Sequence, residues 1–120
     1  MYKRQAINRG IHNYTSVNDL SLALSKLYNN KCVSKEYDTL MLDILKNNKY
    51  DEKIPKLIPT TASVLNKSGE YPLIENDASI IVTDKGAYVL CITTSNSSNK
   101  KEIQSIRNAS KEIYDAYINS

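Results

Sequence analysis

The chain of 120 residues contains no tryptophan, no phenylalanine and only one histidine, and it has three glycines and three prolines. So few glycines and prolines leave no flexible linker, and no internal repeat is present. No apolar run reaches the roughly 18–20 residues that a membrane-spanning helix needs. With 41% apolar and 24% charged residues, the composition predicts one ordinary globular domain.

Cysteine is also scarce, with Cys32 and Cys91 as the only two. They show no C-x-x-C spacing and have no histidine nearby, so we expect neither a disulfide nor a metal site, and no cofactor. His12 stands beside no possible nucleophile and is interpreted as a loop residue. The net charge of +3 comes from scattered lysines, which favours a solvated surface over a nucleic-acid partner.

Apolar residues at helical spacing predict two helices in the first half of the chain. Ser16 is the expected N-cap of the first, which should end near 29–30, and Ser34 is the N-cap of the second, which should fade at 47–48. The apolar stripe of the second helix consists of Tyr37, Leu40, Met41, Ile44 and Leu45. We expect the two helices to form an antiparallel pair.

The second half has the pattern of strands. Residues 62–68, 79–83 and 87–93 are the predicted strands, with a turn at Asn76-Asp77 and a hairpin at 84–86. The third strand is a continuous apolar run, which favours a central strand covered on both faces.

A closing helix should follow, capped by Asn99 with Glu102 in a capping box. The fold class is therefore α+β: two helices, a three-stranded antiparallel sheet and a C-terminal helix. The predicted sheet is small, and both of its faces need to be covered by other elements. We therefore expect part of the structure to be missing from the chain.

The most informative stretch is N-K-S-G-E at 66–70, at the end of the first predicted strand. Alone, the tripeptide K-S-G is equally compatible with an exposed lysine before a glycine turn. Its surroundings follow a fuller pattern, because two helices and a proline-containing segment (53–59) precede it, and a second strand, a hairpin, an apolar strand and a long helix follow. On this set of features, which includes Asn13–Ser16 before the first helix, residues 6–120 resemble the C-terminal part of class A β-lactamases.

The resemblance implies roles for four residues. Lys67 and Ser68 are the expected catalytic residues: the lysine supplies positive charge near the substrate carboxylate and the nucleophile, and the serine hydroxyl donates to that carboxylate. Gly69 allows the backbone to approach the ligand, and the N–H of Glu70 is an oxyanion-hole donor. Such a donor is typically worth about 10²–10³ in rate.

The resemblance also shows what is absent. The family's nucleophilic S-x-x-K, its S-D-N motif and its Ω-loop glutamate all lie upstream of the matching region. One S-x-x-K occurs at Ser97–Lys100, but it lies in a polar loop and is interpreted as chance. The strand after K-S-G carries no arginine for carboxylate recognition, and Arg107 lies too far along on the last helix.

Three functions follow as expectations. The chain is part of a β-lactam-hydrolysing serine enzyme and is inactive alone, or part of a D-Ala-D-Ala peptidase or other cell-wall hydrolase, or a small non-catalytic α+β binding or structural domain. The substrate is accordingly a β-lactam or a peptidoglycan peptide.

Met1–Gln5 fits the family poorly and matches the translated end of a common sequencing-library transposase adapter. We therefore expect these five residues to be non-native and the natural sequence, a partial β-lactamase-like domain, to span 6–120. The parent protein is expected to be exported from a bacterial cell, with its signal peptide outside this chain.

Overall fold

The computed structural model describes residues 14–120. Its elements are the helices α2 (Val17–Tyr28) and α3 (Lys35–Lys46), the short 3-10 helix η1 (Ile54–Leu57), the strands β1 (Ser63–Tyr71), β2 (Ile74–Thr83) and β3 (Gly86–Ile92), and the helix α4 (Lys100–Ile118). This order confirms the predicted α+β class. The expectations for Met1–Gln5 and His12 lie outside the described residues.

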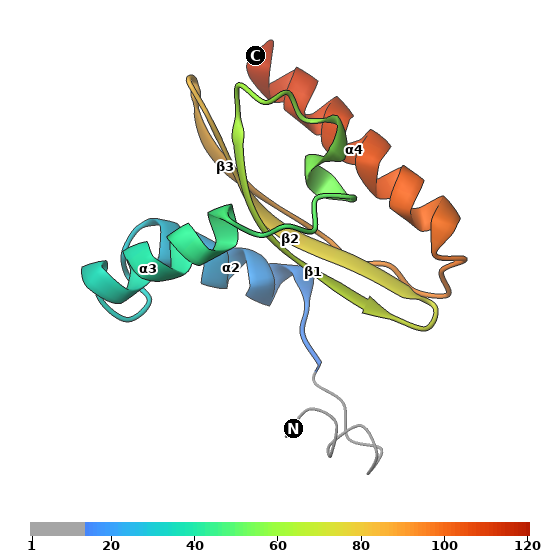
Figure 1. Ribbon diagram of the computed structural model, residues 1–120, viewed down its shortest axis with the longest axis horizontal. Coiled ribbons are helices and arrows are strands. Elements are labelled where there is room, and N and C mark those ends of the chain that lie inside the picture. Colours follow the sequence, from blue (N-terminus) through green and yellow to red (C-terminus); the bar gives the residue numbers. More distant parts are fainter. Residues whose placement is uncertain (1–13) are drawn as a thin grey trace.

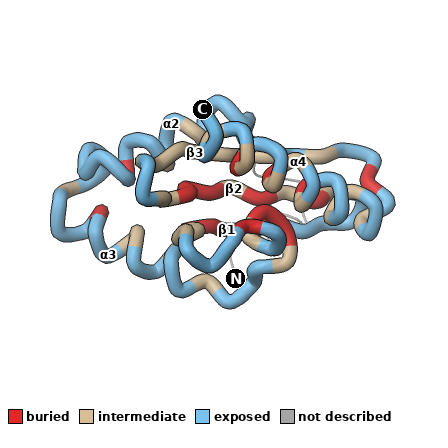
Figure 2. The backbone as a smooth tube through the Cα atoms, turned by 90° about the horizontal axis from the view of Figure 1, so that it is seen from above, coloured by how far each residue is buried: buried red, intermediate tan, exposed pale blue. Residues whose placement is uncertain are grey.

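The strands form one antiparallel sheet between two helical layers (Figure 1). α2 and α3 lie on one face, where α2 packs on β2 and β3 and α3 packs on β1, while η1 and α4 lie on the other face. In Figure 1, α2 and α3 run in opposite directions, as expected for an antiparallel pair. Buried positions concentrate along β2, in the middle of the sheet (Figure 2). The main core cluster consists of Ile54, Ile58, Ile81, Ile106 and Tyr114.

Two expectations about the sheet were wrong. The first hairpin turns at residues 72–73, where Leu73 has a φ of 66°, and not at Asn76-Asp77, which pair with Gly69 and Ser68 inside the ladder. The polar pair stays in β2 because its side chains bind elsewhere: Asn76 accepts from the Thr94 N–H and Asp77 from the Ile54 N–H.

The strand β3 is an edge strand of the described sheet and not its centre. Consecutive hairpins place β2 in the middle, but the expected cover on both faces of β3 is present. Its side chains are half-buried along its whole length, because α2 covers one face and the core cluster beside α4 covers the other.

The helix caps agree with the sequence at two of three sites. The Ser16 hydroxyl accepts from the Asp19 N–H at 3.1 Å, and the Ser34 hydroxyl accepts from the Tyr37 N–H at 3.2 Å. At α4, Asn99 occupies the N-cap position but makes no side-chain cap bond. The Glu102 carboxylate instead accepts from the N–H and hydroxyl of Ser98, so a carboxylate in the first turn replaces the expected capping box.

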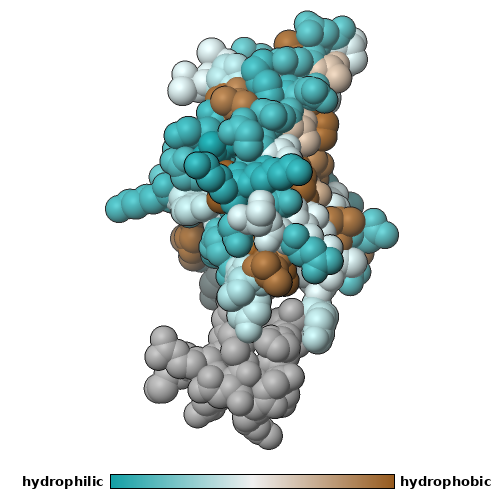
Figure 3. Space-filling model, turned by 90° about the vertical axis from the view of Figure 1, so that its right-hand side faces the viewer, coloured by the Kyte–Doolittle hydropathy of each residue, from teal (hydrophilic) through white to brown (hydrophobic). Residues whose placement is uncertain are grey.

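The helix α3 buries only part of its predicted apolar stripe. Tyr37, Leu40 and Ile44 are each more than half exposed, although the helix packs on β1 and on α2. By contrast, the face that carries α4 is mainly hydrophilic, with hydrophobic side chains in small separate groups (Figure 3).

Asp38 anchors the loop that joins α2 to α3. Its fully buried carboxylate accepts from the N–H groups of Cys32 at 2.8 Å and Val33 at 2.9 Å. Burial alone would raise the pKa of Asp38, but the hydrogen bonds from the amides of Val33, Cys32 and Ser34 outweigh it and hold the pKa below its usual value.

Asp38 therefore predicts a pH dependence of stability. A carboxyl with a lowered folded-state pKa stabilises the fold above its unfolded pKa of about 3.9, and this stabilisation is lost as the pH falls through the folded value. We expect Asp38→Asn to lose less stability than the wild type between about pH 5 and pH 3, as measured by the urea midpoint. The exposed Asp43→Asn should follow the wild-type curve, and parallel curves for Asp38→Asn and the wild type would contradict the assignment.

Candidate active site

Within residues 14–120, β1 is an open edge strand of the sheet, and the K-S-G sequence lies along it. Glu75, on the neighbouring strand, donates its N–H to the Thr94 hydroxyl at 2.8 Å and accepts from that hydroxyl through its C=O at 2.7 Å. Its backbone groups therefore point away from β1. Since Glu70 is its partner in the register, the two residues form a non-hydrogen-bonded pair. The N–H and C=O of Glu70 thus point outward, to the open edge.

The same alternation holds for the preceding outward-facing positions of β1. The Asn66 carbonyl accepts from the Asn48 side chain at 3.0 Å, and the Ser68 carbonyl accepts from Lys67 Nζ at 2.8 Å. Both carbonyls are thus turned away from β2. The edge next to K-S-G consequently carries a row of backbone donors and acceptors together with one lysine ammonium group.

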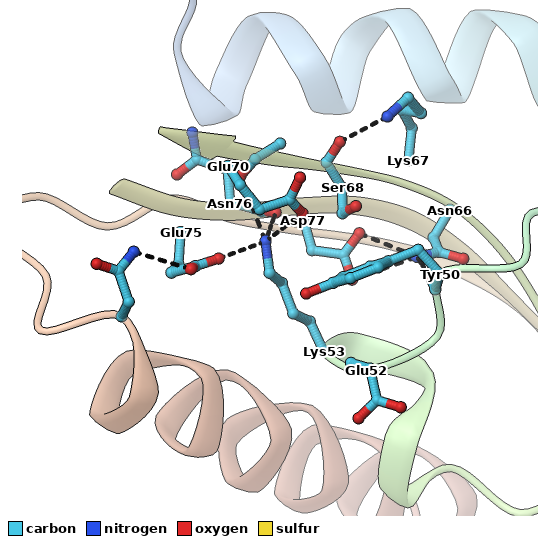
Figure 4. A network of polar contacts seen from close by, with 12 residues as sticks. Tyr50, Glu52, Lys53, Asn66, Lys67, Ser68, Glu70, Glu75, Asn76 and Asp77 are labelled. Carbon is cyan, nitrogen blue, oxygen red and sulfur yellow. Dashed lines mark hydrogen bonds and ion pairs between the residues drawn. The ribbon is translucent and has the colours of Figure 1, made fainter. Parts of the chain in front are cut away.

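The side chains of the four predicted site residues divide between the two faces of the sheet. Lys67 and Gly69 belong to one face and Ser68 and Glu70 to the other, because side chains alternate along a strand. Lys67 is exposed, whereas Ser68 is only 7% exposed. In Figure 4, Lys67 lies on the opposite side of the strands from Lys53. What the four residues share is therefore the open edge and not a common face.

A second lysine, which the sequence did not single out, is central to the other face. Lys53 immediately precedes η1 and is fully buried. Its ammonium group lies 2.7 Å from Glu75 Oε2 and 2.9 Å from Glu70 Oε1. Its three N–H groups are shared between these carboxylates and two backbone carbonyls, those of Asn76 at 3.0 Å and Gly69 at 3.3 Å. One buried cation thus joins the ends of β1 and β2 (Figure 4).

The charges of this cluster favour the ion-paired state. Burial alone would lower the pKa of Lys53, but its bonds to Glu75 and Glu70 outweigh it and raise that pKa. For Glu70, burial acts to raise the pKa, while the contacts with Lys53 and the Ser68 hydroxyl lower it below the usual value. The lysine is therefore protonated and Glu70 ionised at neutral pH.

Asp77 fixes η1 to the sheet beside this cluster. Its buried carboxylate accepts from the Ile54 N–H at 3.0 Å and from the Asn66 side chain at 3.1 Å. Burial raises the pKa of Asp77. One carboxyl group thereby holds both Ile54, the first residue of η1, and Asn66, which precedes K-S-G.

The S-x-x-K sequence at Ser97–Lys100 has a structural role at the start of α4. Ser97 is 1% exposed, and its hydroxyl accepts from the Asn99 N–H at 2.7 Å and donates to Glu102 at 3.2 Å. A buried hydroxyl with these partners is unsuited to attack a substrate. This arrangement supports the interpretation of the motif as chance.

The structure also shows what lies opposite Lys67 and where Arg107 binds. Ala78 is the register partner of Lys67, so a methyl group faces the lysine from the neighbouring strand. Arg107 is engaged elsewhere, since its guanidinium group lies 2.9 Å from the Glu52 carboxylate and also donates to the Glu52 carbonyl. Arg107 is therefore bound to Glu52 and not to the edge at which Lys67 lies.

The chain belongs to the beta-lactamase enzyme family, whose sequence pattern matches residues 1–117. Among solved structures it is similar to a β-lactamase from Sphaerobacter thermophilus (TM-score 0.83, 24% identity) and to PBP-A (TM-score 0.83, 22% identity), and it covers 41% of each. In both comparisons 88% of this chain is matched. A class A β-lactamase representative from Bacteroides cellulosilyticus matches all of the chain over 48% of its own length (TM-score 0.82, 16% identity). No curated protein sequence matches.

The chain therefore spans less than half the length of these structures, and the shared fold confirms the predicted element order.

Proposed function

We propose that the chain is the C-terminal, K-S-G-bearing part of a serine hydrolase that opens β-lactam rings through an acyl-serine intermediate. The observation that carries the proposal is the open edge of β1, where the outward N–H of Glu70 follows directly on Lys67-Ser68-Gly69. A backbone N–H held at a sheet edge is a fixed donor for the oxyanion that forms on a substrate carbonyl. The nucleophilic serine would come from the part of the protein that precedes these elements.

Each residue at the edge has a role in this proposal. Lys67, with its ammonium group already at the edge, attracts the substrate carboxylate, and Gly69 leaves room for the ligand to approach the backbone. The Ser68 hydroxyl contacts the Glu70 carboxylate in the free chain, so its donation to a substrate requires a rotation about χ1.

A cell-wall peptidase is the second candidate. The fold matches PBP-A as well as it matches a β-lactamase, and one similar structure is a PBP-A L158E mutant in an acyl-enzyme complex with penicillin G. The methyl group of Ala78 opposite Lys67 also lacks the charge that an arginine would supply to a β-lactam carboxylate. Family membership weighs against the third expectation, in which K-S-G is incidental in a non-catalytic domain.

The cellular location is part of the proposal. We infer that the parent protein is exported, since both β-lactams and peptidoglycan peptides are met outside the cytoplasmic membrane. Over residues 14–120, none of the helices has the length and apolar character needed to cross a bilayer.

The isolated 120-residue chain is expected to leave a chromogenic cephalosporin intact, because Ser97 is fixed in a helix cap and Ser98, which begins the overlapping S-x-x-K at 98–101, donates its hydroxyl to Glu102. The measurement is the absorbance change at high protein concentration, with Ser97→Ala as the matched variant. Turnover by the chain that disappears in Ser97→Ala would overturn the assignment of the nucleophile to another segment.

The function itself is tested on the complete protein that carries this chain. We expect a mass increase of one β-lactam on incubation with penicillin, followed by release of hydrolysed product for a β-lactamase. A long-lived adduct together with cleavage of a D-Ala-D-Ala peptide would identify the peptidase instead. A complete protein that forms no acyl adduct with either compound would show the proposal to be wrong.

A further inference from the structure

We propose that Lys53 is a positioning residue for the oxyanion-hole donor: it holds the peptide group between Gly69 and Glu70 so that the Glu70 N–H stays directed to the open edge. This inference rests on the proposed function and assigns a role to a residue outside the K-S-G sequence.

The carbonyl of Gly69 and the N–H of Glu70 belong to one planar unit and point in opposite directions. Lys53 Nζ donates to Gly69 O at 3.3 Å on the inner side, so the same bond fixes the N–H toward the outside. A cation on the carbonyl also polarises the unit and makes its N–H a stronger donor.

Glycine makes such a restraint useful at this position. A Cβ on Gly69 would lie 4.0 Å from the Asn76 Cβ, an ordinary contact distance, so packing within the chain does not require glycine. Glycine has more backbone freedom than any other residue, and the register places Gly69 in a hydrogen-bonded pair with Asn76, so the ladder holds its carbonyl from one side. The clamp from Lys53 adds a second, charged donor to the same carbonyl and so restrains the glycine peptide further.

The ammonium group is held from several elements at once. Glu75 Oε2 approaches it at 2.7 Å, and Glu75 is itself fixed by the Asn99 side chain, which donates to Oε1 at 2.9 Å. The Glu70 carboxylate and the Asn76 carbonyl complete its surroundings. The start of η1, both strands of the first hairpin and the start of α4 therefore meet at one buried charge.

The test is a double-mutant cycle in the complete protein with a chromogenic cephalosporin. Lys53→Met is expected to lower kcat by about 10–10²-fold with a smaller change in KM, because a misplaced donor acts on the transition state. Lys53→Arg, which keeps the charge, should recover part of the loss, and the exposed Lys56→Met should behave as the wild type.

The cycle separates positioning from general support of the fold. In a protein that already lacks the amide, Glu70→Pro, the further change Lys53→Met should lower kcat by no more than about two- to threefold, since coupled residues are not additive. If Lys53→Met prevents folding, the same cycle is run with Lys53→Arg, for which a loss of several-fold and the same non-additivity are expected.

Two results would overturn the inference: folded Lys53 variants with wild-type kcat, or equal losses in the wild-type and Glu70→Pro backgrounds. Either result would leave the proposed function standing. That function fails on a different observation, namely a wild-type protein that forms no acyl-enzyme.

Discussion

Glu70→Pro in the complete protein is expected to lower kcat/KM for a chromogenic cephalosporin by about 10²–10³-fold, the effect of removing one oxyanion-hole donor. Proline removes the outward N–H and nothing from the β1–β2 ladder, because Glu70 stands in a non-hydrogen-bonded pair on an edge strand. Edge positions of this kind are where a sheet tolerates proline. The structure thus offers a substitution that deletes a backbone donor while leaving strand pairing in place.

Glu70→Ala is the matched control, because it removes the carboxylate but keeps the amide. Its expected loss is less than about tenfold, since Lys53 retains Glu75 and both carbonyls as partners. Steady-state kinetics of both variants, with circular dichroism to confirm folding, give the comparison. Equal losses in the two variants would show that the carboxylate matters and that the amide is not the donor.

Much of the fold was predictable because its signals are local. Ser16 and Ser34 each stand before a helical apolar pattern, and both act as N-caps as expected. The predicted strands at 79–83 and 87–93 correspond to β2 and β3, although β3 ends one residue earlier, at Ile92. These features depend on residues within a few positions of one another, so a single sequence contains the information they need.

The first hairpin shows where a local signal misleads. Asn-Asp is a common turn sequence, yet the pair lies inside β2, because Asp77 binds the amide of Ile54. The turn occurs instead at residues 72–73, where Leu73 takes a left-handed conformation that is uncommon for leucine. At the turn, the Leu73 carbonyl accepts from the Ser97 N–H at 2.8 Å, so tertiary hydrogen bonds outweigh local preference at both positions.

The candidate site was likewise predictable only in part. The K-S-G sequence identified the edge strand, but the register that turns the Glu70 amide outward became visible only through the contacts of Glu75 with Thr94. The role of Lys53 was not predictable because its partners follow it in the sequence by 16 to 23 residues. A charged residue beside Ile54-Pro55 reads as surface until the strands that enclose it are known.

Lys53 is also where the isolated chain should be most sensitive. Lys53→Met is expected to destabilise the 120-residue chain by about 3–5 kcal/mol, as measured by urea unfolding, because removing one partner of a buried ion pair leaves the other charge uncompensated. The uncompensated group is chiefly Glu75, whose side chain is 6% exposed, whereas Glu70 is 46% exposed and reaches water. Lys56→Met, at a lysine with an exposed i,i+4 pair, should cost less than about 1 kcal/mol.

A second substitution identifies the cause. Glu75→Gln removes the stranded charge while keeping an oxygen for the Asn99 side chain, so Lys53→Met/Glu75→Gln should be more stable than Lys53→Met alone. Loss of a methylene contact or of helix propensity at Lys53 would give no such recovery. If the double variant is less stable than the single one, or if Lys53→Met and Lys56→Met unfold at the same urea concentration, the buried cation does not hold the ends of β1 and β2 together. The clamp on the Gly69–Glu70 peptide would then lose its physical basis.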